Sequence, residues 1–239
     1  MAGTVAEAPP GRTRLLLSML VFGDREARRH RTGTLRRWHE LGWQTWVWTR
    51  WSLLGVSGAR VPLFPSRLDL LDAAARESPP GGLWLEFGVF RGESINRLAR
   101  HRADAVVGFD SFVGLPEKYG GNLGRGAFSL EGRLPPVASN VKLVKGWFAE
   151  TLPRFLAEHP EAAVSLLHVD SDLYESARLV MEQLGSRLGP GSVIVFDEFV
   201  GWLDNSEYRA FFEFQRASGL GHRYIGCSPS GSVALQLTA

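Results

Sequence analysis

The stretch Leu83–Ser94, with the sequence LWLEFGVFRGES, decides the fold class of this 239-residue chain. Leu83–Phe87 is an apolar run that predicts a buried strand, and Gly88 and Gly92 form a turn directly after it. Glycine lacks a Cβ, so a ligand can approach such a turn closely, and a helix starting near Glu93 would point its free N–H groups at the same place. The stretch predicts a nucleotide or cofactor cradle, although turns of this kind also serve packing.

Outward from this turn, short apolar runs alternate with helical patterns. Parallel strands are predicted at Leu83–Phe87, Ala105–Phe109, Val141–Val144, Val164–Val169 and Ser192–Phe196. Helices are predicted between them, near 93–101, 148–159 and 173–188, with a further helix near 206–217. Ser228–Gly231 then joins two last strands, Arg223–Cys227 and Ser232–Leu237, as an antiparallel hairpin. The order predicts an α/β fold with a doubly wound, mostly parallel sheet.

The chain divides into two parts by composition. Residues 1–65 are predicted to be an N-terminal helical extension that acts as a lid or contacts a substrate or a second subunit, because it holds five of the eight tryptophans. Ser66, with Asp69 three residues later, starts the first helix of a main domain that spans residues 66–239. The Gly- and Pro-rich residues 111–140 are predicted to form a lid or binding loop.

Charge and cysteine content exclude several classes of protein. A net charge of +2 gives no global field for nucleic acid, and the arginines between residues 25 and 37 are better explained as a solvated helix face. The apolar run Leu15–Phe22 is too short to cross a bilayer. A single cysteine, Cys227, excludes an intrachain disulfide and predicts a buried thiol in a reducing compartment. We therefore expect a cytoplasmic protein that binds neither nucleic acid nor a membrane.

Acidic residues follow most of the predicted parallel strands. Glu86 and Asp110 come at the ends of the first two strands, 24 residues apart, which is the spacing at which a carboxylate reaches the hydroxyls of a ribose. The alternative for Asp110 is a turn or helix cap. In parallel sheets the ligand lies outside the carboxyl ends of the strands, so these acids mark the predicted site.

A second acidic group, Asp170, Asp197 and Glu198, follows the fourth and fifth strands. Neighbouring strands lie about 4.8 Å apart, so these carboxylates can converge and bind Mg²⁺ through oxygen. Separate caps and surface acids are the alternative. Asp170 and His222 are the candidate catalytic residues, whereas His168 lies on a buried strand and is better explained as a core residue. The sequence has no Gly-x-Ser-x-Gly elbow, phosphate-binding loop or zinc spacing.

Five motifs in order resemble class I S-adenosylmethionine-dependent methyltransferases of the macrocin O-methyltransferase type. They are EFGVFRGES from Glu86, GFDSFVGLPE from Gly108, KGWF from Lys145 with TLP from Thr151, HVDSDLYES from His168, and VFDEF from Val195. The resemblance covers roughly residues 80–235. It implies a seven-stranded sheet and transfer of a methyl group to a hydroxyl of a small-molecule acceptor, a sugar or similar polyol in a natural-product pathway.

The resemblance also implies the roles of individual residues. The methionine part of S-adenosylmethionine would contact Glu86, Gly88, Gly92 and Ser94, the ribose would contact Asp110, and the adenine would lie among Ser111, Phe112, Trp147 and Phe148. Mg²⁺ would be held by Asp170, Asp197 and Glu198, with Asp170 also next to the cofactor. Two departures are an Asp-Glu pair at 197–198, where the family usually has two aspartates, and Ser171, where it has glycine.

Two other functions fit parts of the same pattern. A nicotinamide-dependent dehydrogenase uses a similar sheet, but the sequence lacks Gly-x-Gly-x-x-Gly and ends in a hairpin. A protein that keeps the fold only to bind a partner through its Trp- and Arg-rich start is the non-enzymatic alternative. A homodimer is the expected assembly.

Overall fold

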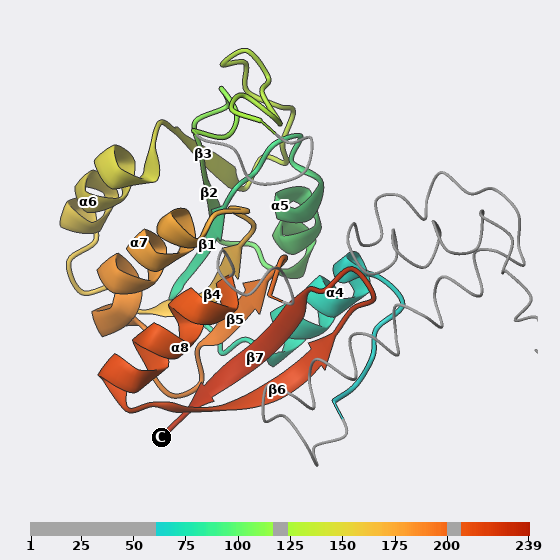
Figure 1. Cartoon of the computed structure of the whole chain (residues 1–239), viewed down its shortest axis with the longest axis vertical. Helices are drawn as coiled ribbons and strands as arrows, with labels where there is room; N and C mark the ends of the chain where they lie inside the picture. The colour runs from blue at the N-terminus through green and yellow to red at the C-terminus, as the bar shows by residue number, and fades with distance from the viewer. Residues whose placement is uncertain (1–60, 117–123, 200–206) are drawn as a thin grey trace, which may run out of the picture. The chain divides into compact units, whose positions relative to one another are not determined.

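Seven strands form one sheet through the described part of the chain, which comprises residues 61–116, 124–199 and 207–239 of a computed structural model (Figure 1). The parallel strands are β1 (Leu83–Phe87), β2 (Val106–Asp110), β3 (Val141–Lys145), β4 (Val164–Val169) and β5 (Val193–Phe196). All of β4 and β5 is buried, because helices cover both faces of the sheet. Antiparallel strands β6 (Gly221–Cys227) and β7 (Val233–Thr238) complete the order β3-β2-β1-β4-β5-β7-β6, which confirms the predicted fold class.

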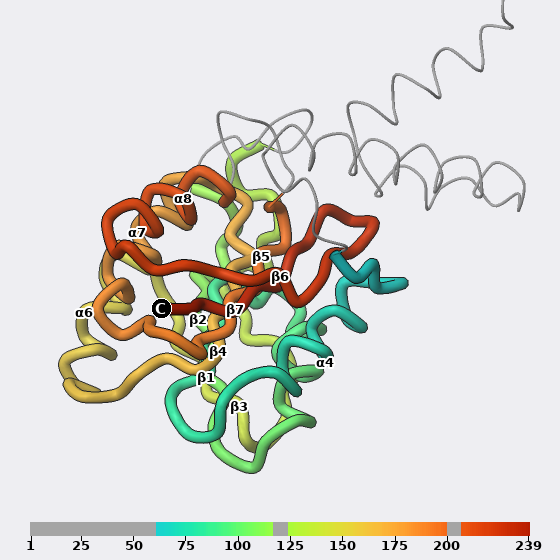
Figure 2. The backbone as a smooth tube through the Cα atoms, turned by 90° about the horizontal axis from the view of Figure 1, so that it is seen from below, coloured from blue at the N-terminus to red at the C-terminus, as the bar shows by residue number. Residues whose placement is uncertain are grey.

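The helices pack in two layers. One face carries α4 (Arg67–Glu77) and α5 (Glu93–Leu98), and the other carries α6 (Phe148–Glu158), α7 (Tyr174–Leu184) and α8 (Glu207–Ser218), as Figures 1 and 2 show from two directions. The predicted start of α4 is confirmed, because the Ser66 hydroxyl accepts a hydrogen bond from the backbone N–H of Asp69 at 3.2 Å. Helix α5 is shorter than predicted and continues as a 3₁₀ turn to His101.

The segment before α4 is hydrogen-bonded to β6, the outermost strand on one side of the sheet. Leu63 pairs with Cys227 of β6, where the N–H of Phe64 donates to the Cys227 carbonyl at 2.8 Å. Cys227 is buried, as predicted. The predicted N-terminal helices lie outside the described residues, and the boundary at residue 65 and the homodimer stay predictions. No helix among the described residues is long and apolar enough to cross a membrane.

The strand registers bring the predicted site residues to one edge of the sheet. Glu86 of β1 lies opposite Gly108 of β2 and His168 of β4, and His168 lies opposite Val195 of β5. The carboxyl ends of these four strands therefore open at the same edge. The described residues of the predicted loop 111–140 contain neither helix nor strand, and its role as a lid stays a prediction.

Candidate functional site

Asp110, the last residue of β2, fixes the glycine turn after β1. Its Oδ2 accepts hydrogen bonds from the backbone N–H groups of Val89 and Phe90 at 2.9 and 2.8 Å. Its Oδ1 accepts a third from Phe112 at 2.6 Å. A carboxylate has about four acceptor positions, so the fold uses three of them. Asp110 thus fixes two neighbouring loops, and its predicted contact with a ribose stays a prediction.

The turn itself depends on glycine at two positions. Gly88 has φ +94° and Gly92 has φ +79°, both in the region that favours glycine. A Cβ on Gly88 would overlap the carbonyl oxygen of Asp170, which follows β4. The turn is therefore pressed against the loop that carries the second acidic group.

Glu86 makes hydrogen bonds that support the glycine turn. Its side chain is fully buried and accepts a hydrogen bond from the Ser94 hydroxyl at 3.0 Å and one from His168 Nδ1 at 2.8 Å. These hydrogen bonds hold the turn in place, and the predicted contact of Glu86 and Ser94 with the methionine part of the cofactor stays a prediction.

His168 belongs both to the core and to the site. Burial alone would lower the pKa of His168, but its hydrogen bond to Glu86 and the charges of Glu86 and the nearby aspartates raise that pKa overall. One His168 nitrogen, one Asp170 oxygen and one Asp197 oxygen lie within 4.8 Å of one another. His168 thus links the glycine turn of β1 to the acids that follow β4 and β5.

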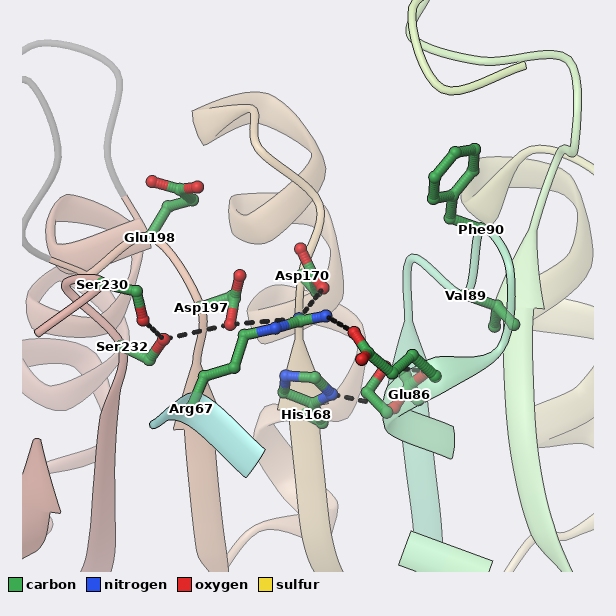
Figure 3. Close-up of polar contacts among 12 residues, drawn as sticks. Arg67, Glu86, Val89, Phe90, His168, Asp170, Asp197, Glu198, Ser230 and Ser232 are labelled. Carbon is green, nitrogen blue, oxygen red and sulfur yellow. Dashed lines mark hydrogen bonds and ion pairs between the residues drawn. The ribbon is translucent and has the colours of Figure 1, made fainter. Parts of the chain in front are cut away.

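The acids predicted to bind a metal converge in part (Figure 3). One carboxylate oxygen of Asp170 and one of Asp197 lie within 4.8 Å of each other. Burial is the main cause that raises the pKa of Asp170 well above its ordinary value, and the negative charge of Asp197 adds to it. Glu198, the third predicted ligand, is not part of the group and extends away from the two aspartates in Figure 3. Two of the three predicted ligands are therefore brought together.

Arg67 lies between the two aspartates and was not a sequence candidate. Its Nη1 is 3.3 Å from Asp170 Oδ2 and 3.5 Å from Asp197 Oδ1, and its Nη2 is 2.7 Å from Glu93 Oε2. Burial alone would lower the pKa of Arg67, but Asp197 and Asp170 raise it overall. Nothing in the local sequence of α4 indicates this contact, because Arg67 and Asp170 are 103 residues apart.

Glu207, at the start of α8, connects the two loops that carry the aspartates. It is 1% exposed and accepts hydrogen bonds from the backbone N–H of Ser171 at 3.3 Å and of Glu198 at 3.0 Å. Burial raises the pKa of Glu207 well above its ordinary value. In the sequence Glu207 is one of several acids that follow β5, and no local pattern distinguishes it from the others.

The β6–β7 turn supports Asp197 from the other side. The Ser232 hydroxyl donates to Asp197 Oδ1 at 3.0 Å, and Ser230 and Ser228 extend the hydroxyl chain with spacings of 3.0 and 2.7 Å. Figure 3 shows Ser230 and Ser232 beside Asp197. The hairpin predicted from its short turn therefore positions a site residue as well as closing the sheet.

His222 does not belong to the site. It lies opposite Leu237 at the end of the β6–β7 pair far from Asp197, whereas Cys227, at the near end, lies opposite Val233. Its Nδ1 is 2.7 Å from Gln215 Nε2, and its ring packs on Phe211 and other aromatic rings. The expectation that His222 acts in catalysis is corrected, because His222 lies near the start of β6, far from the carboxyl ends of the parallel strands, where Asp197 lies.

The residues predicted around an adenine differ in their exposure. Phe112 is fully buried in the hydrophobic core, and its predicted place beside an adenine stays a prediction. Ser111 is 9% exposed and accepts a hydrogen bond from the N–H of Val113 at 3.2 Å. Trp147 is 39% exposed at the start of α6, and Phe148 packs edge-on against Phe87. Trp147 is the most exposed of these rings and is available for stacking.

Two cavities lie apart from this group. One of about 470 Å³ is lined by Gly82, Ser165 and Ser192, near the amino ends of the parallel strands. The other, of about 430 Å³, lies between α7 and α8. Neither is lined by Asp110, Asp170 or Asp197, so the candidate site is defined by its converging polar groups.

Comparison with known proteins supports the resemblance found in the sequence. Residues 132–224 match the macrocin O-methyltransferase family. A curated relative from Streptomyces olivaceus, 8-demethyl-8-(2,3-dimethoxy-alpha-L-rhamnosyl)-tetracenomycin-C 4'-O-methyltransferase, is 30% identical over 164 residues. That match covers 56% of this chain and 60% of the relative, so the chain spans less than two thirds of its length.

Two solved structures share the fold. A calicheamicin methyltransferase is 22% identical with a TM-score of 0.54, and the match covers 99% of this chain and 98% of that one. The O-methyltransferase NovP is 21% identical with a TM-score of 0.53, covering 72% and 80% of the two chains. The predicted resemblance to macrocin O-methyltransferases and the predicted methyltransferase fold are both confirmed.

Proposed function

We propose that this protein is an S-adenosylmethionine-dependent O-methyltransferase that acts on a sugar hydroxyl and is assisted by Mg²⁺. The observation that carries the proposal is the continuous polar connection along one sheet edge. Asp110 fixes the glycine turn, and the Glu86–His168 pair joins that turn to Asp170 and Asp197. This connection supports a cofactor cradle beside an acidic group that would hold an acceptor.

The cofactor half of the proposal uses Asp110, the turn at Gly88 and Trp147. S-adenosylmethionine, when bound, supplies an electrophilic methyl group on a positively charged sulfur. The carboxylate of Asp110 and the absence of a Lys-containing phosphate loop favour a cationic adenosine ligand over a nucleotide phosphate. Trp147 is exposed at the start of α6, where it can stack on an adenine ring.

The acceptor half uses the two aspartates. Asp170 and Asp197 fit a divalent cation, because an oxygen of each and a nitrogen of His168 lie within 4.8 Å of one another on neighbouring strands. Mg²⁺ bound there would lower the pKa of an acceptor hydroxyl. Magnesium often takes one or two carboxylates and keeps water or substrate oxygens as its other ligands.

Asp170 is the proposed base. Its backbone lies against the turn that would hold the methyl donor, and a carboxylate positioned beside a reacting hydroxyl can accept its proton. With the cofactor bound, its methyl group would pass from sulfur to the acceptor oxygen and leave S-adenosylhomocysteine, and the Asp170 carboxylate would take the hydroxyl proton. Holding donor and acceptor in line accounts for much of the rate.

The proposed acceptor is a deoxysugar hydroxyl such as one on rhamnose. The Streptomyces olivaceus relative carries a rhamnosyl group in the name of its substrate. A second solved structure of the calicheamicin enzyme, 22% identical with a TM-score of 0.51 and covering 97% of this chain and 96% of that one, is described as a TDP-rhamnose 3'-O-methyltransferase. A rhamnose linked to a nucleotide or to a polyketide is the first substrate to test.

The sheet order favours this proposal over a dehydrogenase. Nicotinamide-dependent dehydrogenases of the doubly wound type have a sixth strand after the fifth in the order 3-2-1-4-5-6. In this chain an antiparallel β7 is inserted between β5 and β6. The terminal hairpin also carries Ser232, which holds Asp197, so the difference in topology forms part of the site.

Calorimetric titration with S-adenosylmethionine tests the cofactor assignment. We expect the wild type to bind and Asp110→Asn to bind at least about tenfold more weakly, because the variant loses a charge and part of its hold on the turn. Asp104→Asn is the matched control, since the Asp104 side chain is 80% exposed and pairs only with Arg102 among the contacts in the described residues. Methylation of TDP-rhamnose, followed by mass spectrometry, tests the acceptor. Failure of the wild type to bind the cofactor would refute the proposal.

A further inference from the structure

Arg67 is a cation placed where the proposed function requires a metal ion. Its guanidinium lies between the carboxylates of Asp170 and Asp197, as Figure 3 shows. The ligand atoms of this pair and of His168 lie within 4.8 Å of one another, so the space suits one cation. An arginine and a divalent ion placed there together would repel each other strongly.

The two sets of contacts that Arg67 makes are unequal. Its Nη1 is 3.3 and 3.5 Å from the two aspartates, and the longer distance exceeds that of an ordinary hydrogen bond. Its Nη2 is 2.7 Å from Glu93, whose side chain is 64% exposed. The shorter bond is therefore the one outside the acidic group, and it is the one that Arg67 can keep while releasing the aspartates.

The position of Arg67 permits such a release. It is the first residue of α4, and its long side chain is 26% exposed, so rotation about its side-chain bonds can move the charge without moving the helix. Glu93 is the first residue of α5, next to the glycine turn. An exchange of cations at the aspartates would thus leave the Arg67–Glu93 pair at the edge of the cofactor cradle.

We infer that Arg67 is a resident counter-ion that must release Asp170 and Asp197 before a divalent cation binds between them, and that Glu93 holds the released guanidinium. The inference rests on the proposed function only in assigning a divalent cation to this group. It gives Arg67 a positioning role: the arginine keeps the two acids together and sets the metal concentration at which the site is loaded.

Binding of Mn²⁺ to the full chain, measured by electron paramagnetic resonance, tests the inference without an activity assay. We expect Arg67→Met to bind Mn²⁺ at least about tenfold more tightly than the wild type, because the competing charge is gone. Arg67→Lys keeps the charge and should stay within about threefold of the wild type. Arg97→Met removes an equal charge from the Asp72 pair between α4 and α5 and should leave Mn²⁺ binding unchanged.

The outcomes separate this inference from the proposed function. The inference is overturned if Arg67→Met binds Mn²⁺ no more tightly than the wild type. It is also overturned if Arg67→Lys binds Mn²⁺ as tightly as Arg67→Met, because the effect would then come from packing and not from charge. S-adenosylmethionine binding by the same variants is measured in parallel. A variant that still binds S-adenosylmethionine is folded. If such a variant shows no change in Mn²⁺ affinity, the inferred role of Arg67 is wrong, and the proposed methyl transfer is unaffected.

Discussion

At the scale of single residues, the site depends on close approaches that few side chains permit. Gly88 touches the backbone of Asp170, so the glycine turn and the loop after β4 are in direct contact. Asp110 fixes the same turn through two backbone N–H groups. The geometry of the cradle therefore depends on the absence of a side chain at Gly88 and on the carboxylate of Asp110.

We expect Gly88→Ala to lower the free energy of unfolding by about 3 kcal/mol or more, from a strained φ together with overlap of the new methyl group and the Asp170 carbonyl. Gly219→Ala is the matched control, because Gly219 has φ +71° with open space around it and should lose only about 1 kcal/mol. Chemical denaturation measures both. Equal losses would mean that the contact between the turn and Asp170 contributes nothing.

At the scale of secondary-structure elements, the start of α8 joins the ends of β4 and β5. The carboxylate of Glu207 accepts from backbone groups in both following loops. On the other side, the β6–β7 turn holds Asp197 through Ser232. The two aspartates are thus placed by a helix and a hairpin that come later in the chain than either of them.

The raised pKa of Glu207 makes stability depend on pH. In the folded state Glu207 keeps its proton above the pH at which an unfolded glutamate loses it. The folded state therefore binds more protons, and stability falls as pH rises from the ordinary glutamate pKa through the raised one. Asp170 and His168 have raised pKa values and act in the same direction.

We expect Glu207→Gln to show a smaller loss of stability between pH 5 and pH 8 than the wild type, because the variant has no proton to lose there. Urea denaturation at both pH values, with EDTA present, measures the difference. Glu182→Gln, on the exposed surface of α7, should keep the slope of the wild type. An unchanged slope in Glu207→Gln would show that the carboxylate does not titrate differently in the folded state.

At the scale of the whole molecule, the site is spread over four neighbouring strands. Asp110 ends β2, the turn follows β1, and Asp170 and Asp197 follow β4 and β5. A ligand at this edge would connect segments that are distant in the sequence. Its binding should therefore protect the sheet edge and leave the surfaces of α7 and α8 unaffected.

Hydrogen exchange measured by mass spectrometry checks this expectation. S-adenosylmethionine at a hundredfold excess over its dissociation constant should raise the free energy of unfolding by about 2.7 kcal/mol. It should slow exchange at residues 88–92 and 110–112, while NAD gives no protection. Protection confined to the α7–α8 cavity would place the ligand elsewhere.

The sequence by itself determined the fold class and the edge of the sheet that carries the site. Buried parallel strands read as short apolar runs, and the acids that end them must meet at one edge, so Asp110, Asp170 and Asp197 were predictable. Only the tertiary structure decided that Arg67 lies between two aspartates, that His168 pairs with Glu86, and that His222 lies outside the site. The physical reason is that periodicity fixes which face a residue takes, whereas packing of distant segments fixes which side chains meet.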